Sequence, residues 1–316
     1  MTEIGNEAEV KREIVNFLQG VSISITPDAA EKVADFREHV RPETTIFVGL
    51  LPGGDYHDVV RTARKLHEQG FRVVPHFTAR NIAGPKALED YLESVCEVAA
   101  VEEVLVLAGD VASPIGDYHC SMQLLETGLF DQYGIKRIGV AGHPEGTSDI
   151  GAYDLKRALA QKNAFARQTD AEMYILTQFC FDAETIIDWE KRINAAGNRL
   201  PICAGIAGPM ELAALIRIAA KCKIGDSMRM LTRLAGSLAK SGSLRSPDRI
   251  VARLAGHHAK QKNGAIQRAH VFTFGNVAKA SHWINAGMDG NFTMQDEGRA
   301  FSTDCFSEPK AHTNLG

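Results

Sequence analysis

Short apolar runs rich in β-branched residues alternate along this chain with longer stretches whose apolar positions recur at helical spacing. The short runs are typical of strands in a buried parallel sheet, and the stretches between them are typical of helices, so the pattern predicts repeated βα units. Eight strand-like runs are found, at residues 21–25, 45–50, 72–75, 104–107, 137–141, 174–177, 201–206 and 270–274. Eight parallel strands are the number in a (β/α)8 TIM barrel.

Helices are expected between these runs, at residues 28–40, 58–69, 86–98, 153–167 and 183–196. The longer interval between the seventh and eighth strands predicts extra helices over 210–222, 227–239 and 247–258. No Pro-, Ser- or Gly-rich linker interrupts the chain, which favours a single barrel domain over 1–316. Residues 289–316 lack periodicity and are expected to form an irregular C-terminal tail.

A doubly wound open sheet is the alternative fold, because it too is a string of βα units. Such a sheet commonly carries G-x-G-x-x-G after its first strand, whereas here the first strand is followed by Thr26-Pro-Asp-Ala-Ala30. The chain also lacks G-x-x-x-x-G-K-[ST], the phosphate-binding loop motif. The TIM barrel is therefore the favoured fold.

Composition and charge narrow the classes of partner. The formal net charge of −4 argues against a nucleic-acid-binding protein, which usually carries an excess of basic residues. The polar N-terminus and the absence of a long apolar run predict a cytoplasmic protein without a signal peptide or membrane span. The six cysteines form no C-x-x-C pair, so reduced thiols are expected rather than disulfides or a metal site. The adjacent His257 and His258 are expected at a solvated helix end rather than at a metal.

Polar groups at strand ends are the first candidates for a functional site, because in a parallel barrel all strands end at one mouth. The run 104–110 ends in Asp110, and the run 174–182 contains Gln178. An amide within so apolar a run needs hydrogen-bond partners, which a ligand could supply. Asp110 has a simpler alternative role, which is to cap the next helix.

An ordered set of short motifs resembles the methylenetetrahydrofolate reductase family and spans nearly the whole chain. The motifs are Pro75-His-Phe-Thr78, Leu107-Ala-Gly-Asp110, His143-Pro-Glu145, Asp154-Leu-Lys156, Leu176-Thr-Gln-Phe-Cys-Phe-Asp182, Gly205-Ile206 and Phe272-Thr-Phe274. The resemblance implies a (β/α) barrel that interconverts 5,10-methylenetetrahydrofolate and 5-methyltetrahydrofolate in one-carbon metabolism. It also implies NADH or NADPH as the reductant and FAD at the mouth.

The resemblance further implies roles for single residues. Asp110 and Gln178 match the pair that holds the pterin ring, whose donor and acceptor edge suits a carboxylate with a carboxamide. Phe179 and Phe274 are expected to form apolar walls for a flat heterocycle. The residues expected to bind the cofactor are His76, Thr78, Gly109, Tyr118, Lys156 and Lys162.

The chain departs from the family at other positions. Ser24 stands where the family has a glutamate that acts as an acid, and a serine hydroxyl is not a comparable proton donor. Gly49, Ala108, His143 and Thr147 stand where the family has FAD contacts. These departures predict weakened or absent flavin dependence. They also require a substitute acid, for which His143, Glu145 and Asp55 are the candidates, with Asp110 as the further catalytic residue.

Two explanations of these departures are open. The protein transfers hydride directly from NAD(P)H to the folate, which the retained Asp110 and Gln178 favour, or it is a redox-inactive folate-binding protein on the same barrel. A third alternative is a barrel enzyme that acts on another pterin or one-carbon compound. The expected partner in the first two cases is a small folate. The choice between NADH and NADPH, the direction of the reaction and a homo-oligomeric state stay open.

Overall fold

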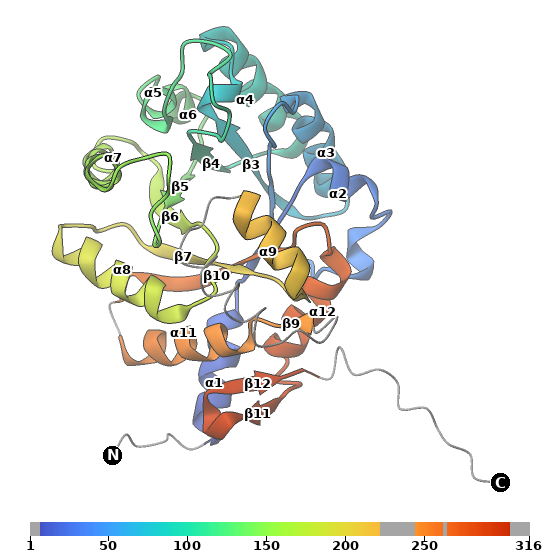
Figure 1. The fold of residues 1–316 in the computed structure, drawn as a ribbon. Helices are drawn as coiled ribbons and strands as arrows, with labels where there is room; N and C mark the ends of the chain where they lie inside the picture. Colours follow the sequence, from blue (N-terminus) through green and yellow to red (C-terminus); the bar gives the residue numbers. More distant parts are fainter. Residues whose placement is uncertain (1–6, 222–243, 262–263, 304–316) are drawn as a thin grey trace.

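Eight parallel strands close into a barrel in the computed structural model, which describes residues 7–221, 244–261 and 264–303. Around the barrel the strand order is β1-β10-β7-β6-β5-β4-β3-β2 (Figure 1). The bounds are β1 Ser22–Ile25, β2 Thr45–Val48, β3 Arg72–Thr78, β4 Glu103–Leu107, β5 Arg137–Gly142, β6 Glu172–Thr177, β7 Ile202–Ala207 and β10 Ile266–Phe272. The predicted (β/α)8 TIM barrel is confirmed, and each strand overlaps its predicted run.

The strands are buried on both faces, which explains why they appear in the sequence as continuous apolar runs. One set of side chains fills the barrel interior, and this inner cluster consists of Phe47, Val74, Leu105, Tyr174, Leu176 and Cys203. The other set, including Ile23, Ile46 and Val104, packs with the surrounding helices in the main core. Neighbouring positions of a strand therefore serve two different cores.

Charged side chains close the N-terminal end of the barrel. The Arg137 guanidinium lies 3.0 Å from the Glu103 carboxylate, and that of Arg268 lies 3.6 Å from it. Both guanidinium groups lie over the ring of Tyr174, each 5.2 Å from its centroid. Because this end is filled by paired charges, the opposite end, where the strands finish, is the one available for a ligand.

Most of the predicted helices between strands are present. They are α3 (Tyr56–Glu68), α4 (Pro85–Ala99), α7 (Ala152–Phe165) and α8 (Ala183–Ala195). The single helix predicted over 28–40 is wrong, since the segment forms α2 (Pro27–Glu31) and a short 3-10 helix, η1 (Phe36–Glu38). The break occurs because Asp35 is in an extended conformation and its carboxylate caps the second piece by accepting from the Arg37 N–H.

The interval between the seventh and eighth barrel strands contains α9 (Leu212–Lys221) and α11 (Asp248–Lys260), as predicted, and the two-residue strands β8 (Met210–Glu211) and β9 (Leu244–Arg245). The predicted helix over 227–239 lies outside the described residues. The sequence patterns did not predict α1 (Glu7–Leu18), α5 (Ser121–Leu125), α6 (Leu129–Gln132) or α12 (Val277–Met288). None of the described helices is both long and apolar enough to cross a bilayer.

The segment after α12 is ordered where an irregular tail was predicted. Strands β11 (Thr293–Gln295) and β12 (Ala300–Ser302) pair antiparallel and lie near α1 in Figure 1, and a short 3-10 helix, η3 (Asp296–Gly298), joins them. Phe301 lies between the rings of Trp283 and Phe292, with centroids 5.9 and 4.6 Å away. This aromatic packing explains the order, and residues 304–316 lie outside the described part.

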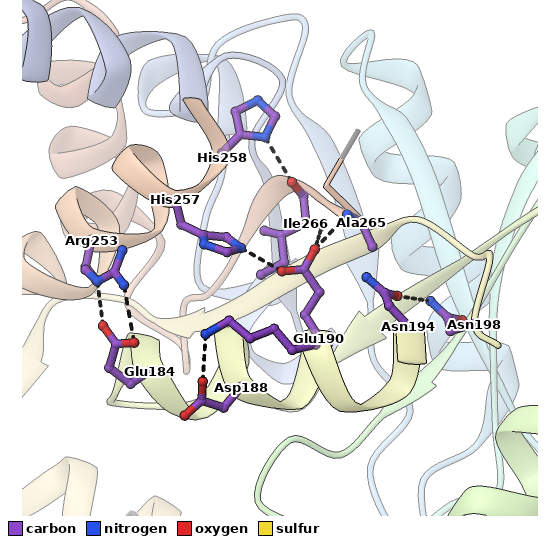
Figure 2. Close-up of polar contacts among 11 residues, drawn as sticks. Glu184, Asp188, Glu190, Asn194, Asn198, Arg253, His257, His258, Ala265 and Ile266 are labelled. Atoms are coloured by element: carbon purple, nitrogen blue, oxygen red, sulfur yellow. Dashed lines mark hydrogen bonds and ion pairs between the residues drawn. The ribbon is translucent and has the colours of Figure 1, made fainter. Parts of the chain in front are cut away.

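A buried carboxylate joins α8, α11 and the start of β10 (Figure 2). Glu190 accepts hydrogen bonds from the N–H groups of Ala265 (2.7 Å) and Ile266 (3.1 Å), and its second oxygen lies 2.7 Å from His257 Nε2. His258 Nδ1 lies 2.9 Å from the Ile266 carbonyl oxygen. The expectation of a solvated helix end was wrong for His257, which is buried against Glu190.

Candidate active site at the mouth of the barrel

Gln178 directly follows β6 and faces the mouth with an unused donor. Its backbone N–H donates to the Gly142 carbonyl oxygen (2.8 Å), which continues the pairing of β6 with β5. Its side-chain oxygen accepts from the Phe179 N–H (3.1 Å), which fixes the amide group. The side-chain NH2 makes no hydrogen bond with the described residues, so it is available to a ligand.

Asp110 presents an exposed carboxylate three residues beyond Leu107, which ends β4, and no described residue pairs with it. The next helix, α5, is capped at Cys120, so Asp110 does not cap it and the simpler role is wrong. Gly109 has φ of +92°, and a Cβ there would lie 3.3 Å from Thr78 Cβ and 3.1 Å from Asn81 Oδ1. A glycine is therefore required beside Asp110.

Aromatic rings form one wall of the mouth. Phe272 and Phe274 are stacked with centroids 5.9 Å apart at 19°, and Phe179 meets the Phe274 ring edge-on at 5.0 Å. The three rings cluster with Met210 and with Leu215 of α9. Phe274 has φ of +48°, a backbone conformation that is strained for a phenylalanine and that occurs often at functional sites. The wall suits a flat heterocycle.

The end of β3 contributes buried polar atoms that lack a partner among the described residues. They are His76 Nε2 and Thr78 Oγ1. Burial lowers the pKa of His76 to about 4, so this imidazole is neutral at pH 7. Gly49 lies against the same ring, since a Cβ at that position would be 3.5 Å from His76 Nδ1. Buried polar groups normally have partners, so these atoms fit contact with a ligand or water.

His270 is a further buried imidazole inside the barrel, on β10. Its Nδ1 lies 2.8 Å from the Ser22 hydroxyl on β1, and its Nε2 has no partner among the described residues. Burial, followed by the nearby His76, holds the pKa of His270 well below its ordinary value. Ser24, two residues after Ser22 on the same strand, faces the same interior. Its register partners are Phe47 and Phe272.

The end of β5 brings His143 and Lys162 into proximity. Burial and then the charge of Lys162 lower the pKa of His143 to about 4. Lys162 is 7% exposed, and burial lowers its pKa to about 8. Its ammonium group donates one long hydrogen bond, of 3.4 Å, to the Ala141 carbonyl oxygen. A buried ammonium group with so few acceptors is suited to an anionic group of a ligand.

The other predicted site residues differ in their surroundings. Lys156 is exposed and, being six residues before Lys162, lies on a different face of α7. The Tyr118 ring is buried in the main core, which leaves little of it for a cofactor. Glu145 interacts with the thiol of Cys180, whose pKa burial and this carboxylate raise. Asp55 caps α3 and binds His57, and these hydrogen bonds lower its pKa, which makes it a poor acid at pH 7.

Sequence reasoning missed three residues of this region. Phe272 and His270 share the inward face of β10, and the alternation of that strand could have identified them. Arg80 makes hydrogen bonds to the backbone of the loop that follows β4, and no sequence signal marks such contacts because carbonyl groups occur at every residue.

Comparison with known proteins identifies the family of this chain. A family model described as methylenetetrahydrofolate reductase matches residues 38–279, which include seven of the eight barrel strands in whole. The chain belongs to the methylenetetrahydrofolate reductase family. Methylenetetrahydrofolate reductase 2 of Saccharomyces cerevisiae is 28% identical over 186 residues, which are 56% of this chain and 30% of the yeast protein. The chain thus aligns with less than a third of that relative's length.

A solved structure has the same fold. It is an uncharacterized protein from Clostridium thermocellum, described as binding two copies of 5-methyl-5,6,7,8-tetrahydrofolic acid. The superposition has a TM-score of 0.51 at 11% identity and covers 87% of this chain and 99% of the other. At this identity the likeness establishes the barrel fold. Membership of the family is shown by the family model.

Proposed function

We propose that this protein interconverts 5,10-methylenetetrahydrofolate and 5-methyltetrahydrofolate with NAD(P)H, with weakened or absent flavin dependence. The observation that carries the proposal is the pair of unused groups at the mouth, the exposed Asp110 carboxylate and the free Gln178 NH2 group. One accepts and the other donates, as the amide-like edge of a pterin requires. The wall that contains Phe274 provides the apolar surface for the ring.

The residues at the mouth fit a reductant that carries phosphate groups. Lys162 offers a buried ammonium group with a single long hydrogen bond, and His76 and Thr78 offer buried polar atoms without partners in the described chain. These three residues would hold the anionic and polar parts of the bound dinucleotide, whose reduced nicotinamide supplies the hydride. FAD is less well supported, because Lys156 is exposed and the Tyr118 ring is buried in the main core.

The protein's own contribution is to bind, orient and shield the folate. Asp110 and Gln178 fix the pterin edge, and the rigid rings of Phe272 and Phe274 set its plane and exclude water from one face. His143, neutral at pH 7, is suited to hold a hydrogen bond rather than to give up a proton.

The test is anaerobic oxidation of NADH and NADPH with 5,10-methylenetetrahydrofolate, with and without added FAD. We expect turnover without flavin. Asp110→Asn and Gln178→Ala should each lower kcat/KM roughly 10- to 100-fold, since each removes a hydrogen bond to a polar or charged group. The matched controls are Asp170→Asn and Gln168→Ala, two exposed side chains in the segment before β6, at the opposite end of the barrel from the mouth. Equal activity of the site variants and the controls would refute the assignment.

A redox-inactive folate-binding protein is the second candidate function. It is favoured by Ser24, which leaves the inner face of β1 without a carboxylate. In that case the protein would bind 5-methyltetrahydrofolate, the binding would weaken in Asp110→Asn, and neither nicotinamide nor added flavin would support turnover. Equilibrium binding measured beside the turnover assay separates the two functions.

A further inference from the structure

The Asp110 carboxylate has no described partner of its own, so its position depends on the backbone that carries it. That backbone is the loop of residues 108–120, called here the Asp110 loop, which connects β4 to α5. It contains no helix or strand, and Ile115 near its middle is 65% exposed. A long irregular loop can present a binding group accurately only if contacts from a rigid element hold it.

Arg80, in the short 3-10 helix η2 (Ala79–Asn81) after β3, makes four hydrogen bonds to the Asp110 loop. Its backbone N–H donates to the Ala108 carbonyl oxygen (2.9 Å), and its own carbonyl oxygen accepts from the Ile115 N–H (3.0 Å). Its Nε donates to the carbonyl oxygen of His119 (3.1 Å), and Nη1 donates to that of Val111 (3.3 Å). The contacts are distributed over the start, middle and end of the loop.

Two glycines of the loop allow this close docking. A Cβ at Gly116 would lie only 2.0 Å from the Ala83 carbonyl oxygen, and one at Gly109 would contact Thr78 and Asn81. The Asp110 loop therefore rests directly on the segment that contains Arg80. Asp110 lies between Ala108 and Val111, whose carbonyl oxygens both accept hydrogen bonds from Arg80, so the backbone is held on both sides of Asp110.

We infer that Arg80 is a positioning residue, which holds the Asp110 loop in the geometry that binds the folate. The inference rests on the proposed function for the role of Asp110. An arginine suits the task because its planar guanidinium directs several N–H groups at once, so that one side chain reaches two carbonyl oxygens in different parts of the loop. A lysine presents a single ammonium group and cannot reproduce that fork.

A double-mutant cycle on the full-length protein tests the inference, with the dissociation constant of 5-methyltetrahydrofolate as the readout. Arg80→Ala and Arg80→Lys should each weaken binding about 10-fold or more, as expected for a displaced binding group. In the Asp110→Asn background, Arg80→Ala should change binding less than about twofold, because its effect passes through Asp110. Arg37→Ala, which removes an exposed side chain paired with Asp35, is the control and should not change binding.

If the fold-change in the dissociation constant of the double variant equals the product of those of Arg80→Ala and Asp110→Asn, Arg80 acts independently of Asp110. That result would overturn the inference. Unchanged binding in Arg80→Ala would overturn it as well. Methylguanidinium should restore much of the affinity of Arg80→Ala but not that of Asp110→Asn, a rescue that general loss of folding would not show. A thermal unfolding curve like that of the unsubstituted protein checks that the barrel is intact.

Limited proteolysis separates failure of this inference from failure of the proposed function. Thermolysin cleaves before residues such as Val111 and Ile115, and Arg80→Ala should increase cleavage at these sites several-fold, whatever the ligand. If the unsubstituted protein binds no tetrahydrofolate while cleavage increases in Arg80→Ala, the proposed function fails and the loop contact stands. Cleavage equal to that of the unsubstituted protein would show that Arg80 does not hold the loop.

Discussion

Lys162 is a residue whose burial costs stability. Its pKa falls from an ordinary value near 10.5 to about 8 because burial penalises the charged form. Each pKa unit corresponds to about 1.4 kcal/mol, so the buried charge disfavours the folded state by up to about 3 kcal/mol at pH 7. Residues that destabilise the folded state in this way are retained mainly where they serve a function. This cost supports the proposed role of Lys162 at the mouth.

Replacement of Lys162 by Met should therefore stabilise the protein by ~1–3 kcal/mol at pH 7 and greatly reduce turnover. The unfolded chain keeps the lysine proton up to about pH 10.5, whereas the folded protein loses it above about pH 8. The stability of the unsubstituted protein should thus rise between pH 8 and 10.5, and Lys162→Met should lack that rise. Urea unfolding at several pH values measures both effects, and a destabilised Lys162→Met would contradict the argument.

The connection of α8, α11 and β10 depends on Glu190 (Figure 2). Its carboxylate satisfies the N–H groups of Ala265 and Ile266 and contacts His257, with all of these groups buried or half-buried. Removal of one partner of a buried polar group costs more than the contact itself contributes, because the remaining groups stay desolvated. This connection fixes the start of β10, the strand that ends in the aromatic wall.

Substitution of Glu190 by Ala should lower the free energy of unfolding by ~3–5 kcal/mol, since it leaves two N–H groups and an imidazole without their partner. Glu190→Gln should cost less, because its carbonyl oxygen can still accept. The matched control is Glu184→Ala on the same helix, which removes an exposed ion pair with Arg253 and should cost less than about 1 kcal/mol. Chemical denaturation measures the loss in free energy of unfolding for each of the three variants, and the loss should be largest for Glu190→Ala. Equal losses for Glu190→Ala and Glu184→Ala would be inconsistent with a structural role of Glu190.

The elements that the sequence predicted are those whose signal is local. Barrel strands such as β4 and β6 are apolar over their whole length because both faces are buried, and this leaves a clear run. The break at Asp35 was missed because the apolar spacing continues across it. The hairpin of β11 and β12 was missed because its order depends on Trp283, in an element whose packing the local pattern does not reveal.

The same distinction between local signals and contacts of the folded chain applies to the residues of the candidate site. The sequence predicts Asp110 and Gln178 as site residues because strand ends meet at one mouth of a parallel barrel. It did not locate Arg80, whose partners are carbonyl groups of residues 111 and 119, and it did not separate the buried Lys162 from the exposed Lys156. Burial and contacts between distant segments are properties of the folded chain. The roles of these residues stay predictions that the variants above test.

The whole barrel encloses imidazoles that the fold keeps neutral. Burial lowers the pKa values of His76 and His143 from about 6.5 to about 4, and that of His270 falls well below its ordinary value. As pH falls below 6.5 the unfolded chain takes up these protons while the folded barrel does not. Stability that is fully present above pH 6.5 is therefore lost as pH falls towards 4.

We expect the loss to be large. His76 and His143 each contribute up to about 3 kcal/mol, whereas the whole free energy of unfolding of a typical protein is about 5–15 kcal/mol. The urea midpoint should fall steeply between pH 6.5 and 4. His143→Gln should flatten part of that slope by removing one titrating group, whereas His67→Gln, on an exposed side of α3, should leave it unchanged. If the urea midpoints of His143→Gln and His67→Gln depend on pH in the same way, the acid sensitivity does not originate at the mouth. The proposal of a buried, neutral His143 beside the folate would then be wrong.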